Sequence, residues 1–137
     1  MKKISAVTDT NVFVAALLGS RPAVSVYNAF RDGIFTLNIS NELFSEVEGV
    51  LSRPKLGIRA DDKVELLLVI NLGAVITDVS LRVNDCRNPK DNNVLACALG
   101  SSSDCIVTCD RDLLILNPYR NIPIISPTKF ITLLNKS

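Results

Sequence analysis

The alternation of short apolar runs with helix-forming segments is the feature of this sequence that most constrains its fold. The apolar, strand-like runs lie at 4–8, 34–39, 74–79, 105–108 and 122–125. The segments typical of helices lie at 10–18, 22–33, 41–52, 61–72, 91–100 and 128–134. This alternation predicts a parallel sheet with helices on both faces. We therefore expect an α/β fold: a three-layer sandwich with a central, mainly parallel sheet flanked by helices.

Several boundary residues support this division. Pro22 suits the first turn of a helix, where its missing N–H is harmless. Ser40 or Asn41 can cap the helix that follows. The almost wholly apolar run 64–72 does not separate helix from strand by its period, but its length and the following Gly73 favour a helix.

Length and composition indicate one folded domain. A chain of 137 residues, 47% of them hydrophobic, can bury a substantial core. We expect a single domain over residues 1–137 without disordered tracts. No apolar run reaches the roughly 18 residues that a membrane-spanning helix needs. Asp9 and Asn11 interrupt the first apolar stretch, which argues against a signal peptide, so we expect a cytoplasmic protein.

The net charge of +1 gives no global basic field that would indicate a nucleic-acid partner. If the chain binds RNA, its basic residues must act locally. For each of them taken singly, a solvated surface position is the favoured interpretation. The candidates are Lys55, Arg59, Arg87, Lys90 and Arg111.

Cysteine and histidine usage excludes several kinds of chemistry. The four cysteines form no Cys-x-x-Cys pair and the chain has no histidine, so a structural zinc site and a Ser-His-Asp triad are not expected. We expect Cys97 and Cys105 to be buried as small hydrophobic residues. Cys109 fits a turn.

Three aspartates occupy positions where a parallel sheet forms its sites. Asp9 and Asp110 each directly follow an apolar run, and Asp91 begins a helical segment. Sites in such sheets lie outside the carboxyl ends of the strands, where these side chains would share one crevice. Taken singly, each is better explained as a helix cap or turn residue. Together the three carboxylates would repel one another, and a divalent cation is the simplest compensation.

The segment 41–52 offers a fourth acid, but its helical pattern does not identify which. Glu42, Glu46 and Glu48 flank an apolar stripe, and all three fit a solvated helix face equally well.

Four segments, in this order, resemble the motifs of PIN-domain proteins. They are VTDTNV at 7–12, SNELFSEV at 40–47, NPKDN at 88–92 and IVTCDRDLL at 106–114. The resemblance spans nearly the whole chain and selects Glu46 over Glu48. The stretch LSRPK at 51–55 resembles the toxin components of prokaryotic toxin–antitoxin pairs.

The resemblance implies an endoribonuclease, a hydrolase that uses Mg²⁺ or Mn²⁺ to cleave RNA and leaves a 5′-phosphate and a 3′-hydroxyl. A bound divalent ion lets hydroxide form near neutral pH without a histidine. It implies metal binding by Asp9, Asp91 and Asp110, with Glu46 as a further metal ligand or as the residue that orients the attacking water. The implied catalytic residues are Asp9, Glu46, Asp91 and Asp110.

A second group of residues is expected around these acids. Asn11 and Thr108 would fix carboxylate rotamers, although a helix cap and a strand-end hydroxyl explain them equally well. Asp112 would touch the site or cap a turn, and Asn92 would steer a phosphate or cap a helix. Two positions depart from the family pattern: Asn88 stands where relatives often have Asp, and Cys109 where they often have Gly. The first departure weakens an outer contact, and the second alters the turn that aims Asp110.

The expected partners are a single-stranded or structured RNA, an antitoxin protein, and a second copy of the chain bound through the apolar early helices. A catalytically silent PIN-like module that binds RNA or protein remains an alternative. A phosphotransferase with Asp9 as nucleophile is disfavoured, because Asn11 stands where that class has a second Asp. A nucleotide-binding domain is weaker still, because no Gly-rich loop follows the first strand.

Overall fold

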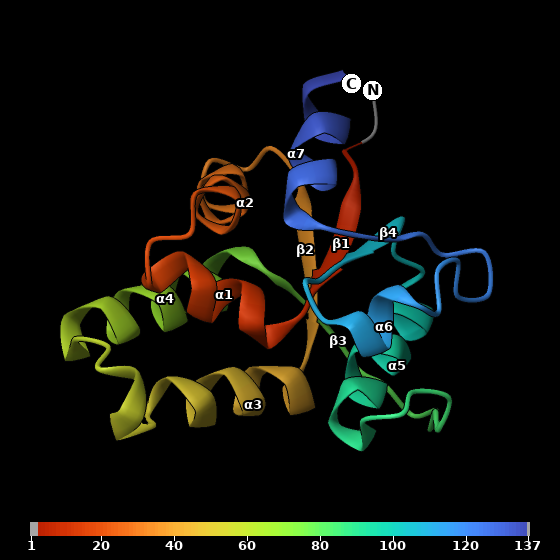
Figure 1. The fold of residues 1–137 in the computed structure, drawn as a ribbon, viewed down its shortest axis with the longest axis horizontal. Coiled ribbons are helices and arrows are strands. Elements are labelled where there is room, and N and C mark those ends of the chain that lie inside the picture. The colour runs from red at the N-terminus through yellow and green to blue at the C-terminus, as the bar shows by residue number, and fades with distance from the viewer. Residues whose placement is uncertain (1–2, 137) are drawn as a thin grey trace.

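A computed structural model describes residues 3–136, and a sheet of five strands lies at its centre (Figure 1). The strands are β1 (Ser5–Thr8), β2 (Thr36–Ser40), β3 (Val75–Thr77), β4 (Cys105–Val107) and β5 (Ile124–Ile125). Their order is β3-β2-β1-β4-β5, and every neighbouring pair is parallel. The predicted parallel sheet is confirmed.

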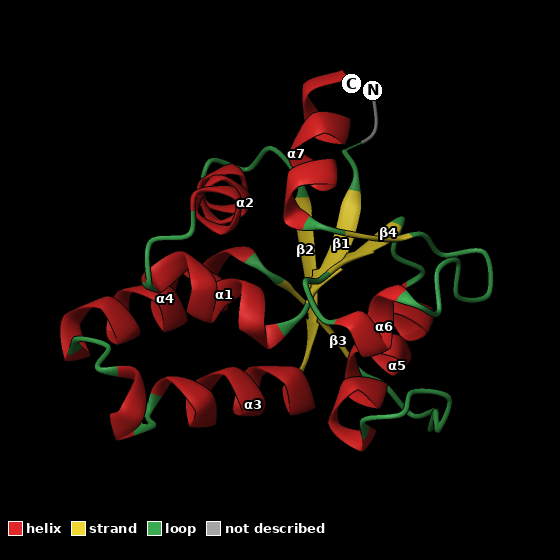
Figure 2. Ribbon diagram, viewed as in Figure 1, coloured by secondary structure: helices red, strands yellow, loops and turns green. Residues whose placement is uncertain are grey.

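Helices cover both faces of this sheet (Figure 2). The helix α5 packs against β1, β2, β3 and β4, while α2 packs against α1, α4 and α7 on the other side. The predicted three-layer α/β architecture is therefore confirmed. The helices are α1 (Thr10–Leu17), α2 (Arg21–Arg31), α3 (Asn41–Leu51), α4 (Ala60–Gly73), α5 (Asn92–Ser101), α6 (Arg111–Leu114) and α7 (Pro127–Lys136), with 3₁₀ turns η1 (Pro54–Leu56) and η2 (Pro89–Asp91).

The central strands are buried because helices cover both of their faces. Val7 on β1 and Ile106 on β4 are fully inaccessible to solvent. On the α2 and α7 side, the rings of Phe35 and Phe130 meet edge to face with centroids 4.8 Å apart, and the centroid of Phe30 lies 6.2 Å from that of Phe35. This geometry is favourable for aromatic pairs, which add stability beyond the area they bury.

Some boundaries differ from the sequence predictions. The second strand begins at Thr36 rather than residue 34, because Gly33 turns the chain with a φ of +74° and Ile34 remains exposed. The edge strand β3 is shorter than the run 74–79. The single-turn helix α6 was not predicted. Ser40 is the residue that caps α3, since its hydroxyl accepts a hydrogen bond from the Leu43 amide at 3.1 Å.

The parallel arrangement brings three helix starts to one edge of the sheet. The carboxyl end of β1 leads into α1, that of β2 into α3, and that of β4 into α6 (Figure 2). Thr8 at the end of β1 pairs in register with Val107 at the end of β4. The residues that follow these strands are therefore neighbours in space.

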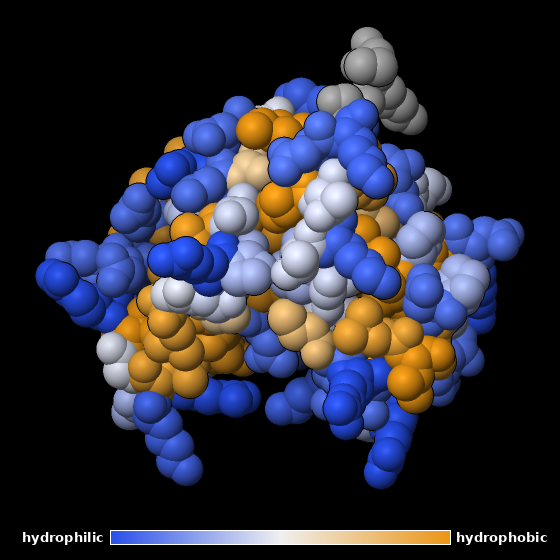
Figure 3. Space-filling model, turned by 45° about the horizontal axis from the view of Figure 1, so that its top comes forward, coloured by the Kyte–Doolittle hydropathy of each residue, from blue (hydrophilic) through white to orange (hydrophobic). Residues whose placement is uncertain are grey.

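The exterior is mixed in character. Figure 3 shows apolar patches interrupting hydrophilic surface on the face it displays. Within residues 3–136, none of the helices combines the length and the apolar character needed to span a membrane.

Candidate active site

The Thr108 side chain joins the two acids that follow β1 and β4. Its hydroxyl donates to Asp9 Oδ2 at 2.9 Å and accepts from the Asp110 amide at 2.9 Å. The Asp9 amide donates to the Val107 carbonyl at 2.9 Å, which extends the pairing of β1 with β4 by one residue. Thr108 is fully buried and Asp9 is 3% exposed. The position of the Asp9 carboxylate is therefore fixed by the sheet itself.

Asp91 brings a third carboxylate to Asp9 and Asp110 from the η2 turn rather than from the end of a strand. It is the last residue of η2, directly before α5, and it is 7% exposed. Carboxylate oxygens of Asp9, Asp91 and Asp110 all lie within 4.8 Å of one another, which makes them the one group of potential metal ligands found among residues 3–136. The three acids singled out by sequence are thus brought together.

Glu46 lies beside this group on α3. Its Oε2 accepts a hydrogen bond from the hydroxyl of Thr10, the first residue of α1, at 2.8 Å. Glu42 and Glu48 are exposed, and neither lines the cleft that contains Glu46. Helix position alone had left the three glutamates open, and the α1–α3 contact distinguishes them.

The acids line a cleft of about 450 Å³ between α3 and the η2 turn. Two basic residues, Arg53 and Lys90, line it as well, and Gly49 and Val50 form part of the α3 wall. The lining residues are Asp9, Thr10, Asn11, Glu46, Gly49, Val50, Arg53, Asn88, Lys90, Asp91 and Asp110.

The acids strongly perturb one another. Burial is the main reason that the pKa of Asp91 rises to about 7, and its hydrogen bond and charge interaction with Asp110 raise the pKa further. The charges of Asp9 and Glu46 act in the same direction. With no cation present, Asp91 therefore favours its protonated form below about pH 7.

Asp9 is affected in both directions. Burial raises its pKa, whereas the Thr108 hydroxyl and the backbone N–H of Asn11 lower it. The charges of Asp110 and Glu46 raise it again, and the net direction is upward. The fold has thus placed several carboxylates where their charges are not balanced.

This donor set fits a hard divalent cation. Carboxylate oxygens are the ligands that Mg²⁺ and Mn²⁺ prefer, and these ions bind through few protein ligands while keeping several waters. A cation would also remove the repulsion that raises the pKa values of Asp9 and Asp91. No histidine or cysteine is needed to complete such a site.

The other candidates occupy different positions around the acids. The Asn11 side chain is exposed on the cleft wall. The Asp112 amide donates to Asp110 Oδ1 at 2.9 Å, so Asp110 also caps α6. The side-chain oxygen of Asn92 accepts from the Cys86 amide at 2.8 Å, and Asn92 lies outside the cleft lining. Asn88, at the family's Asp position, caps η2 by accepting from the Lys90 amide at 3.2 Å.

The three cysteines that the sequence analysis interpreted lie as expected. Cys97 and Cys105 are buried, which raises their pKa values to about 11 and about 12, and Cys109 is exposed in the turn before Asp110. The fourth cysteine, Cys86, for which no expectation was formed, is buried near the acids. Its Sγ lies 3.9 Å from Asp91 Oδ2.

Sequence reasoning also missed Thr10 and Arg53. Thr10 is the second residue of the Asp-Thr-Asn segment, and only the meeting of α1 with α3 reveals its partner. Arg53 follows Glu46 by seven residues, two helical turns, and this spacing was an available signal. Of the basic candidates only Lys90 lines the cleft. Those outside its lining are Lys55, Arg59, Arg87 and Arg111.

Comparisons with known proteins give one family and two solved structures with a similar fold. The family model described as PIN domain matches residues 5–112. The crystal structure of PAE2754 from Pyrobaculum aerophilum is 14% identical with a TM-score of 0.65, and the match covers 98% of this chain and 91% of that chain. That of VapBC2 from Rickettsia felis, bound to a DNA fragment from their promoter, is 14% identical with a TM-score of 0.60, covering 90% and 98%. No curated protein matches the chain significantly.

Proposed function

Because the chain belongs to the PIN-domain family, we propose that it is a metal-dependent endoribonuclease that hydrolyses RNA phosphodiester bonds with Mg²⁺ or Mn²⁺. The observation that carries this proposal is the convergence of Asp9, Asp91 and Asp110 within 4.8 Å in an open cleft. Buried carboxylates that repel one another reduce stability unless a ligand compensates them. Such an arrangement is typical of a functional site.

The proposed roles follow from the contacts. Asp9, Asp91 and Asp110 would hold the metal, which would lower the pKa of a bound water and neutralise charge on the scissile phosphate. Thr108 keeps the Asp9 carboxylate oriented toward the other two acids. Glu46, fixed by Thr10, orients the attacking water and accepts its proton. The products are a 5′-phosphate and a 3′-hydroxyl.

We further propose that the chain is the toxin of a toxin–antitoxin pair in the cytoplasm. The support is the shared fold with VapBC2 and the LSRPK stretch at 51–55. An antitoxin would then bind the chain and block the cleft, and a homodimer would use the apolar early helices. Expression should slow cell growth, Asp9→Asn should relieve that effect, and light scattering should show the dimer. Growth that is equally slow with both proteins would contradict a toxic nuclease.

The primary test is cleavage of labelled single-stranded RNA by the purified protein, with Mg²⁺, with Mn²⁺ and with a chelator. Asp9→Asn should abolish cleavage. Asp104→Asn is the matched control, because Asp104 lies just before β4, at the opposite end of the strand that leads to Asp110. Metal-dependent cleavage that only Asp9→Asn removes supports the proposal. No cleavage of several RNAs, together with no metal binding, would contradict it and favour a silent RNA- or protein-binding module.

A further inference from the structure

We propose that Arg53 and Lys90 form a phosphate brace, a pair of cations with one on each wall of the cleft. These two side chains bind the RNA phosphates that flank the phosphate being cleaved. This inference rests on the proposed function and concerns substrate positioning rather than the chemical step. The four acids of the cleft would repel a polyanion. The brace supplies the attraction that the net charge of the whole chain does not.

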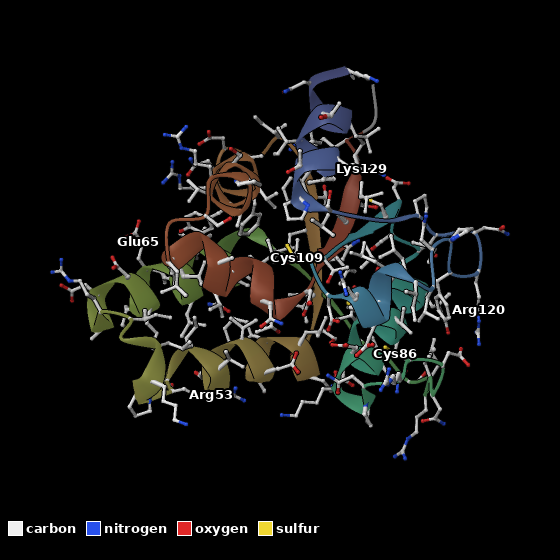
Figure 4. All side chains as sticks on the ribbon, in the orientation of Figure 1. Arg53, Glu65, Cys86, Cys109, Arg120 and Lys129 are labelled. Atoms are coloured by element: carbon white, nitrogen blue, oxygen red, sulfur yellow. The ribbon has the colours of Figure 1, made fainter. Side chains whose placement is uncertain are left out.

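Arg53 belongs to the α3 wall. Glu46, Gly49 and Arg53 follow one another at helical spacings of three and four residues, and all three line the cleft. A Cβ placed on Gly49 would meet no atom within 4 Å, so the wall between the acid and the arginine is open. Arg53 lies just past the end of α3 (Figure 4). A strand of RNA has room to pass from the acids to its guanidinium.

The backbone around Arg53 is held on both sides. Its amide donates to the Val50 carbonyl at 3.1 Å, and its carbonyl accepts from the Leu56 amide at 3.2 Å. Pro54 follows directly and begins η1. A long side chain that starts from a fixed backbone loses less entropy on binding than one on a mobile loop.

Lys90 approaches from the opposite wall. It lies between Pro89 and Asp91 in η2, and its amide donates to the Asn88 side chain at 3.2 Å. Its neighbour Asp91 is one of the three clustered acids. Lys90 is therefore a cation adjacent in sequence to a proposed metal ligand, with a side chain that remains exposed.

Neither cation is neutralised within the part of the chain that the structure describes. The ion pairs found there are Arg31–Asp32 and Arg120–Asp85. Arg53 and Lys90 line the same cleft as four acids, yet make no ion pair with them. Both charges are available to an incoming phosphate. Their binding would be independent of base sequence and would weaken as salt rises.

The chain provides a matched control for each residue. Lys55 lies two residues after Arg53, and Arg87 lies three residues before Lys90. Both controls are exposed cations on the same local segments, but neither lines the cleft. If only the general charge of the surface mattered, substitution of Lys55 or Arg87 would weaken RNA binding as much as substitution of Arg53 or Lys90.

The test measures the affinity of the full chain for a short, fluorescently labelled single-stranded RNA by anisotropy, in chelator and over a range of salt concentrations. We expect Arg53→Gln and Lys90→Gln each to weaken binding roughly five- to tenfold and to lower the slope of log affinity against log salt by about 0.7. Arg53→Lys should retain most of the affinity. Lys55→Gln and Arg87→Gln should remain within about twofold.

Cleavage kinetics with Mn²⁺ separate this proposal from the proposed function. The brace predicts a raised KM with kcat nearly unchanged for Arg53→Gln and Lys90→Gln. If the wild type binds RNA but never cleaves it, the proposed function fails, while the affinities still decide the brace. The brace is overturned if the wild type does not bind RNA, or if Lys55→Gln and Arg87→Gln weaken binding as much as the cleft variants.

Discussion

Asp9 and Asp104 lie at opposite ends of the central strands, and their carboxylates differ in burial and in hydrogen bonding. Asp104 precedes β4, and its Oδ2 accepts from the Ser5 amide at 2.8 Å and from the Ser5 hydroxyl at 3.3 Å. Asp9 follows β1, is 3% exposed, and accepts one side-chain hydrogen bond, from Thr108, with other acids beside it.

The same residue type has its hydrogen-bonding needs met at one edge of the sheet and lies among other acids at the opposite edge. The Asp104 carboxylate is satisfied by the neighbouring strand and exposed to water, so it contributes to folding without needing a ligand. The carboxylates of Asp9 and Asp91 are buried and that of Asp110 is half-buried, and because all three lie within 4.8 Å of one another they repel one another. This difference predicts that the two edges will respond oppositely to substitution.

The largest expected effect is on activity. Asp91→Asn should lower RNA cleavage at least about 100-fold, because it removes a proposed metal ligand. The same change should leave the metal-free fold intact or stabilise it, since it removes a source of repulsion. Cleavage assays and chemical denaturation would measure both. A folded Asp91→Asn protein with full metal-dependent activity would refute the role of this residue.

Metal and pH should act together on stability. Because the pKa of Asp91 in the folded protein is raised to about 7 from 3.8, the folded state holds this proton more tightly than the unfolded state. Its contribution to stability is therefore fully present below pH 3.8 and is lost as the pH rises through about 7. The metal-free Tm should fall over this interval, and Asp91→Asn should flatten the fall.

Added Mn²⁺ should reverse that loss at neutral pH. A ligand present at 100 times its Kd stabilises by about 2.7 kcal/mol. Thermal denaturation in chelator and in Mn²⁺, at several pH values, checks both statements. A metal-free Tm that rises between pH 4 and 7 in the wild type relative to Asp91→Asn would contradict the account.

Thr108→Val should have an intermediate effect. The substitution removes the hydroxyl that joins Asp9 to the Asp110 amide, and we expect a loss of about 1–2 kcal/mol in the free energy of unfolding. Activity should fall roughly 10–100-fold, as for residues that orient metal ligands. Thr132→Val is the control, because Thr132 occupies an exposed position of α7, where its hydroxyl donates to the Thr128 carbonyl of the same helix. Equal losses in both variants would remove the special role of Thr108.

The smallest expected effect concerns Gly49. It lies inside α3, is exposed, and has open space where a Cβ would be. Gly49→Ala should therefore raise the free energy of unfolding by about 0.5–1 kcal/mol through helix propensity. Urea denaturation would detect this gain. A loss of stability would mean that the α3 wall is more tightly packed than the structure shows.

The acids just beyond the ends of β1 and β4 were the easiest part of the site to predict. Asp9 and Asp110 could be placed from sequence because parallel strands end at one edge, whatever the helices do. Glu46 was selected only by family resemblance, since its position depends on how α3 lies against α1. Arg53 was missed although its seven-residue spacing from Glu46 was a signal, because its place in the cleft also depends on how α3 lies against the η2 turn. The partner of a helix residue depends on tertiary packing.

For the fold too, the main architecture could be predicted from the sequence, whereas some local details could not. The alternation of runs predicted the parallel sheet and its two helical layers, and every predicted strand is present. The single turn α6 was missed because four residues carry too little periodic signal to identify a helix. The length of β3 was overestimated because β3 is an edge strand that pairs only with β2, and β2 ends at Ser40, the partner of Thr77.

The most direct test of the central claim is a titration of Mn²⁺ into the wild type, Asp110→Asn and Asp104→Asn, followed by electron paramagnetic resonance. The account predicts saturable binding by the wild type and Asp104→Asn, and at least about tenfold weaker binding by Asp110→Asn. Equal Mn²⁺ affinity in all three proteins, or none in the wild type, would contradict the assignment of the three carboxylates to a metal site.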